Sequence, residues 1–187
     1  MVRNGIGGAN TQTGIMFEQK VDLATYLNNN IAEYNCIEKK YKKLRSKSYK
    51  IYYKGNLVAQ TFQKYSLYAF LEERNIKWKD ILSKQLLPDD CVYIIKNNTV
   101  FIIEIKFQKV NGSIDEKLQT CDFKKKQYKK LFAKLNYDKV EYIYVLSDFY
   151  KAPKYQDILN YIHSMGCDYY FQYLPLSRLG LPISNEK

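Results

Sequence analysis

The sequence predicts an α/β domain in which helices flank a mixed β-sheet. Two β-branched and aromatic runs surround Asn97–Asn98 and predict a β-hairpin over residues 91–107. In the second half, predicted strands alternate with predicted helices, which is typical of a sheet sandwiched by helices. The 187 residues show no repeat and no linker rich in Gly, Pro or Ser. We therefore expect one domain over residues 1–187.

The first half predicts a long helix and a hairpin. Thr13 is placed to cap a helix over residues 14–35, and apolar residues recur in it at helical spacing. These residues are Phe17, Val21, Ala24, Leu27 and Ile31. The run YKIYYKGNLVAQTF at 49–62 predicts a hairpin that turns near Gly55–Asn56.

The remaining elements follow from the same patterns. Two short helices, near 66–74 and 78–84, lead to Pro88 and the 91–107 hairpin. Beyond the hairpin the pattern predicts, in order, a helix at 121–135, a strand at 141–150, a helix at 155–164 and a strand at 167–173.

Composition favours a soluble, polyanion-binding protein. The 46% hydrophobic content excludes a disordered chain, and 30 Lys and Arg against 19 Asp and Glu give a formal charge of +11. This surplus attracts nucleic acid or an anionic membrane surface, although a basic chain can also simply be well solvated. No apolar run reaches about 18 residues. The start, MVRNGIGGANTQ, has no apolar signal core, so we expect a cytoplasmic protein.

The cysteines and the histidine limit the kinds of metal site and catalytic site that we expect in this chain. The four cysteines lie far apart and lack the C-x-x-C spacing of a zinc site. The single histidine, His163, lies in an apolar helical pattern that favours a packed or surface role. These observations disfavour hydrolases built around several histidines and leave carboxylates and lysines as the reactive groups.

The triplet Glu104-Ile105-Lys106 is the strongest candidate site. Strand alternation places Glu104 and Lys106 on one face, about 6–7 Å apart. This triplet lies on a strand that is predicted to be buried, where a charged pair is costly unless it has a function. Other (D/E)-x-K triplets begin at Glu18, Glu38, Asp115 and Asp122.

The pairing register of the predicted hairpin adds a third side chain to this candidate site. With Asn97–Asn98 as a two-residue loop, Cys91 faces Glu104 and Asp89 faces Lys106, so Asp89 joins the pair on one face. Asp90 then turns away with Ile105. A loop one residue longer would instead place Asp90 opposite Glu104. Asp89 is the preferred acid, and the alternative stays open at this stage.

The order Pro88-Asp89, a gap, then Glu104-Ile105-Lys106 resembles the PD-(D/E)XK nuclease motif. Gln108 resembles the trailing glutamine of its extended form. GGANTQTGIMFE is similar to the TG-x-x-FE opening of many restriction endonucleases, where the glutamate, here Glu18, joins the metal-site acids. An ordinary acid in the first turn of a helix is the alternative for Glu18. KVNGSIDEKLQTCDFKKKQY and YLPLSRLGLP also resemble segments of these enzymes.

The resemblance implies a small type II restriction endonuclease. It implies a restriction-endonuclease-like core, with helices on both faces of a central mixed sheet, and Mg²⁺-dependent hydrolysis of double-stranded DNA leaving 5′-phosphates. Mn²⁺ can substitute for Mg²⁺. The implied metal ligands are Asp89, Glu104 and Glu18, and Lys106 and Gln108 complete the catalytic set. The implied partners are double-stranded DNA, a second copy of the chain in a homodimer, and a cognate DNA methyltransferase encoded nearby.

Two lysine-rich segments, 38–50 and 124–134, are candidates for DNA contact. In the second, apolar residues such as Phe123 and Tyr128 predict a buried helix face, with the lysines pointing outward toward phosphates. The residues expected to bind DNA are Lys43, Arg45, Lys117, Lys125 and Lys126. A solvated lysine face is the alternative. Two other functions fit the sequence: a structure-specific resolvase or repair nuclease, and a non-catalytic nucleic-acid-binding module.

Overall fold

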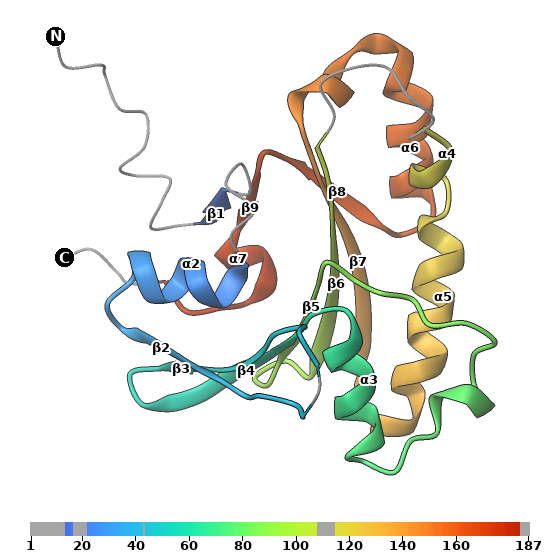
Figure 1. The fold of residues 1–187 in the computed structure, drawn as a ribbon. Coiled ribbons are helices and arrows are strands. Elements are labelled where there is room, and N and C mark those ends of the chain that lie inside the picture. Colours follow the sequence, from blue (N-terminus) through green and yellow to red (C-terminus); the bar gives the residue numbers. More distant parts are fainter. Residues whose placement is uncertain (1–13, 17–21, 43, 108–114, 184–187) are drawn as a thin grey trace, which may run out of the picture.

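A computed structural model describes residues 14–16, 22–42, 44–107 and 115–183 (Figure 1). Its centre is a seven-stranded sheet in the order β2-β3-β4-β5-β6-β7-β8. Neighbouring strands are antiparallel from β2 to β6, while β6-β7 and β7-β8 are parallel. The predicted α/β class with a mixed, helix-flanked sheet is confirmed.

The predicted 49–62 hairpin is confirmed as β3 (Ser48–Tyr53) and β4 (Asn56–Phe62). Its loop is Lys54–Gly55, one residue earlier than expected, because Tyr53 pairs with Asn56. Both loop residues have positive φ, 47° and 81°. This is the backbone of a type I′ turn, which matches the twist of the paired strands and favours glycine.

The predicted helix over 14–35 is wrong in its extent. The helix α2 covers only Leu23–Asn30, and Gly14–Met16 form the short strand β1, which pairs with β9. Asp22 caps the helix, since its Oδ1 accepts from the Thr25 backbone N–H at 2.8 Å. Ile31 is extended, residues 32–33 form a turn, and β2 (Tyr34–Glu38) follows. Ala24, Leu27 and Ile31 are buried as predicted, while Thr13, Phe17 and Val21 lie outside the described residues.

The segment before the central hairpin contains α3 (Tyr65–Glu72) and a single 3₁₀ turn, η2 (Trp78–Asp80), where a longer helix was expected. The hairpin itself is confirmed as β5 (Asp90–Ile94) and β6 (Thr99–Lys106).

The predicted register of this hairpin is wrong. Ile94 pairs with Thr99 and Asp90 with Ile103, so the loop has the four residues 95–98. Contacts within the hairpin and with the distant Asn136 hold this longer loop. Asn98 has φ 48°, accepts from the Tyr93 hydroxyl at 3.1 Å and donates to the Asn136 carbonyl at 3.0 Å. The shift from the expected register is two residues, so the predicted side-chain faces are preserved.

The second half follows the predicted alternation of helices and strands. Its strand β7 ends at Leu146, where a strand to 150 was expected, and 3₁₀ turns follow. The bounds are α4 Asp115–Leu118, α5 Cys121–Phe132, η3 Ala133–Leu135, β7 Lys139–Leu146, η4 Asp148–Lys151, η5 Pro153–Tyr155, α6 Gln156–Ser164, β8 Asp168–Phe171, β9 Tyr173–Pro175 and α7 Leu176–Leu179.

Apolar side chains form a core on each face of the sheet. Helices α3, α5 and α6 pack on one face and α2 and α7 on the other (Figure 1). Residues Val140–Leu146 of β7 are buried, as expected for a parallel strand covered on both faces. Within the described residues, no helix combines the length and apolar character needed to cross a membrane.

Candidate active site

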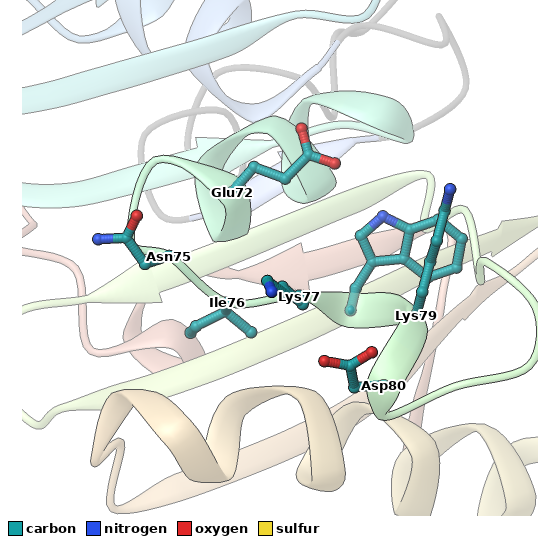
Figure 2. A pocket seen from close by; sticks show the side chains of 7 residues that line it. Glu72, Asn75, Ile76, Lys77, Lys79 and Asp80 are labelled. Carbon is teal, nitrogen blue, oxygen red and sulfur yellow. The ribbon is translucent and has the colours of Figure 1, made fainter.

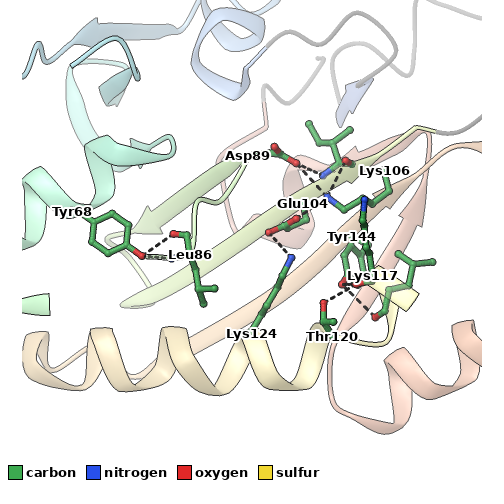
Figure 3. A network of polar contacts seen from close by, with 11 residues as sticks. Tyr68, Leu86, Asp89, Glu104, Lys106, Lys117, Thr120, Lys124 and Tyr144 are labelled. Carbon is green, nitrogen blue, oxygen red and sulfur yellow. Dashed lines mark hydrogen bonds and ion pairs between the residues drawn. The ribbon is translucent and has the colours of Figure 1, made fainter. Parts of the chain in front are cut away.

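Asp89, Glu104 and Lys106 meet on the α5 face of the sheet, as the sequence predicted (Figure 3). Continuing the observed register by one residue places Asp89 opposite Glu104, not opposite Lys106. The Nζ of Lys106 lies 2.7 Å from Glu104 Oε2 and 3.8 Å from Asp89 Oδ2. The expected convergence is therefore present, although the register used to derive it was wrong.

The sheet and the preceding loop fix Asp89. Its Oδ2 accepts from the Ile105 backbone N–H at 2.9 Å, while its side chain stays 39% exposed. Upstream, the Tyr68 hydroxyl accepts from the Leu86 N–H at 2.6 Å and donates to the Leu86 carbonyl at 2.8 Å. The Lys64 N–H donates to the Pro88 carbonyl at 3.0 Å. The carboxylate is thus held in place and remains open to ligands.

Glu104 is the buried acid of the site, with a side chain only 8% exposed. A lone carboxylate at such a position would be costly. Two ammonium groups balance it: Lys106 on Oε2, and Lys124 of α5 on Oε1 at 3.2 Å. Lys124 belongs to the lysines of α5 that were expected to point outward toward phosphates, and for Lys124 this expectation is wrong. It lies one turn before the buried Tyr128 on the same helix face, which indicates an inward position.

Buried tyrosines form the floor beneath Glu104. Tyr128 of α5 and Tyr142 and Tyr144 of β7 are fully buried. Burial, with the negative charge of Glu104 as a further cause, raises the pKa of each phenol well above its ordinary value. The Tyr144 hydroxyl donates to the Lys117 carbonyl at 3.1 Å. These phenols stay neutral near pH 7 and provide a low-polarity floor that strengthens charge interactions above it.

Asp90 lies on the opposite face, toward α2. It is 3% exposed and accepts from the Cys91 N–H at 3.0 Å and from the Leu23 backbone. Burial, with the charge of Asp22 as the next cause, raises the pKa of Asp90 to about 7. Asp89, and not Asp90, therefore shares a face with Glu104 and Lys106.

We expect Asp90→Asn to stabilise the protein above pH 7. The folded state holds the Asp90 proton to about pH 7, whereas an unfolded aspartate releases it at about pH 4. The folded state thus binds more protons in this window, and the free energy of unfolding falls as pH rises through it. The variant should gain on the order of 2–4 kcal/mol at pH 8, and the gain should vanish toward pH 4. Urea titrations from pH 4 to 8 measure it. The exposed Asp138→Asn is the control, and a pH-independent difference for Asp90→Asn would contradict the expectation.

The other predicted site residues divide into two groups. Glu18, Gln108 and Lys43 lie outside the described residues. Arg45 and Lys117 are exposed, as expected of DNA contacts.

Two further expectations about α5 are wrong. Lys125 does not point freely outward, because its Nζ lies 3.6 Å from the buried Glu141 and donates to the Gly166 carbonyl. Phe123, expected on the buried face, is exposed. Lys126 does point outward, paired at 2.8 Å with Asp122 one turn earlier.

A separate hollow of about 440 Å³ lies beside η2 (Figure 2). Its lining includes Asn75, Trp78 and Asp80, but neither Asp89 nor Glu104. It is distinct from the candidate active site.

The carboxylates of Asp89 and Glu104 are the hard oxygen ligands that Mg²⁺ prefers, and Mg²⁺ usually takes one or two of them, with water and phosphate completing its shell. Within the described ranges, no three His, Cys, Asp or Glu side chains gather in a way that could hold a metal ion. The two carboxylates have the chemistry to supply two ligands of a magnesium site.

Comparisons with family models, curated proteins and solved structures found no match.

Proposed function

We propose that the chain is a Mg²⁺-dependent endonuclease that hydrolyses double-stranded DNA to 5′-phosphate ends, in the manner of a type II restriction endonuclease with a restriction-endonuclease-like core. The observation that carries the proposal is the convergence of Asp89, Glu104 and Lys106 on one partly buried face. The formal charge of +11 suits a polyanionic substrate.

Each of the three converging side chains has a proposed role. Asp89 and Glu104 would hold the metal, which when bound polarises the phosphate and offsets the charge that develops on it. Lys106 is 18% exposed, so its Nζ can reach a water beside the phosphate while it remains fixed by the two acids. We assign it to hold the attacking water and to stabilise the transition-state charge.

Two alternatives have specific consequences. A non-catalytic nucleic-acid-binding module has no reason to bury an acid beside a second acid where phosphates bind, and the Asp89–Glu104 pair disfavours it. A resolvase or repair nuclease would share these residues but read DNA shape. Discrete bands from digested plasmid DNA, or a DNA methyltransferase gene next to this one, would favour the restriction enzyme. A palindromic target would also match a homodimer.

We expect cleavage to depend strictly on a divalent ion. EDTA should abolish cutting of plasmid DNA, and Mg²⁺ or Mn²⁺ should restore it, because the bound metal is proposed to supply the charge stabilisation that the phosphate needs in the transition state. Gel analysis of the digests measures this. Full cleavage in metal-free buffer would refute the proposed function.

A further inference from the structure

Both carboxylate oxygens of Glu104 are occupied by ammonium groups (Figure 3). Lys106 contacts Oε2 at 2.7 Å and Lys124 contacts Oε1 at 3.2 Å. Each oxygen keeps a second lone pair that a metal ion shared by Asp89 and Glu104 could use, but the ammonium group beside it repels that ion. Binding of the ion is therefore favoured when one of the two lysines moves away.

Lys124 is the lysine that is free to leave. Lys106 has three acceptors around its Nζ, namely Glu104, Asp89 at 3.8 Å and the Ile105 carbonyl at 3.4 Å. Within the described part of the chain, Lys124 contacts Glu104 alone, over a longer distance and with 24% of its side chain exposed.

The neighbours of Lys124 on α5 have acids of their own. Lys125 pairs with Glu141 and Lys126 with Asp122. Lys124 has no acidic residue one turn before or after it, since those positions are Thr120, Cys121, Gln127 and Tyr128. Once displaced from Glu104, its ammonium has a DNA phosphate as the available anionic partner.

We propose that Lys124 is a phosphate-binding residue of this site, which neutralises Glu104 in the free protein and transfers to a DNA phosphate when metal and substrate bind. This inference rests on the proposed nuclease function. It makes Lys124 a competitor of the metal in the absence of DNA and a contributor to substrate binding in its presence. A purely structural ion pair would have neither property.

Lys124→Met separates these roles through two measurements that need no cleavage. Without DNA, Mn²⁺ titrated calorimetrically should bind roughly fivefold more tightly, because a competing cation of moderate strength is gone. With a duplex carrying the mapped cleavage site, in Ca²⁺ in place of Mg²⁺ so that the duplex is not cut, the slope of log K against log salt should become shallower by about 0.9, the loss of one phosphate contact. In an otherwise wild-type background, the cleavage rate should fall about 10²-fold.

Lys139→Met is the matched control. Lys139 also pairs with a buried glutamate that has two lysine partners, Glu141, but it lies at the opposite end of the parallel strands, where it aligns with Thr99. It should change neither Mn²⁺ affinity nor salt slope. Lys124→Arg should keep the salt slope, because a guanidinium still binds phosphate. If Lys124→Met fails to fold, Lys124→Gln provides the same neutralisation with a donor retained.

The outcomes are distinct. Unchanged Mn²⁺ affinity and salt slope in the neutral Lys124 variants, with only a lower melting temperature, would overturn the role of Lys124 while the Mg²⁺-dependent cleavage of the wild type still stands. A wild-type protein that cuts no DNA with Mg²⁺ would instead remove the nuclease proposal itself.

Discussion

Glu104→Ala is expected to abolish cleavage while leaving DNA binding intact or stronger. The substitution removes a proposed metal ligand, and the charge stabilisation that a bound metal supplies is worth several kcal/mol, or roughly 10³-fold in rate. It also leaves Lys106 and Lys124 without the carboxylate that now balances them. Both ammonium groups then face the incoming phosphate, which favours binding. Single-turnover cleavage and gel-shift titrations measure the two effects.

Glu141→Ala is the matched control, because Glu141 is equally buried and has two lysine partners away from the site. It should lower the melting temperature and spare the cleavage rate per folded molecule. Equal rate losses in both variants would mean that Glu104 acts through stability alone. Asp89→Ala should behave as Glu104→Ala does, whereas Asp90→Ala should leave the metal site in place, because Asp90 lies on the other face.

The face of the sheet on which each hairpin residue lies could be predicted, because it depends only on whether the register shift is an even or an odd number of residues. Strand alternation fixes Glu104 and Lys106 on one side whatever the loop length. Asp89 joins them for any loop whose length differs from the expected one by an even number. The actual loop is held by Tyr93 of the same hairpin and by Asn136, which contacts Asn98 from a distant part of the chain. A local turn rule could not include the contact with Asn136.

Two other features depend on tertiary structure. The helix α2 is short because Asp22 caps it and Tyr34 is needed for the edge strand that pairs with Tyr53. The lysines of α5 look alike in sequence, yet each has a different environment: Lys124 reaches Glu104, Lys125 reaches Glu141, and Lys126 faces solvent. Helical periodicity indicates which positions face the sheet, but not which acidic side chain each of these lysines contacts.

Lys106→Met is expected to fold normally, bind DNA and metal, and lose most of its turnover. The fold should survive because Glu104 keeps Lys124 as a partner and Asp89 keeps the Ile105 N–H. The rate should fall about 10²–10³-fold, since the ammonium is assigned to hold the attacking water and to offset the charge growing on the phosphate. Thermal melting, gel shifts and single-turnover cleavage at saturating Mg²⁺ separate these quantities.

Lys106→Arg distinguishes a catalytic role from a structural one. A guanidinium can replace an ion-pair partner of Glu104, so a structural lysine should be rescued by arginine in both stability and rate. A catalytic lysine should not be, because the planar guanidinium is larger and cannot place a compact charge and a water in the same positions. We therefore expect Lys106→Arg to recover the melting temperature but not the rate. A Lys106→Met protein that cuts at nearly the wild-type rate would remove the main reason to regard this face of the sheet as a nuclease site.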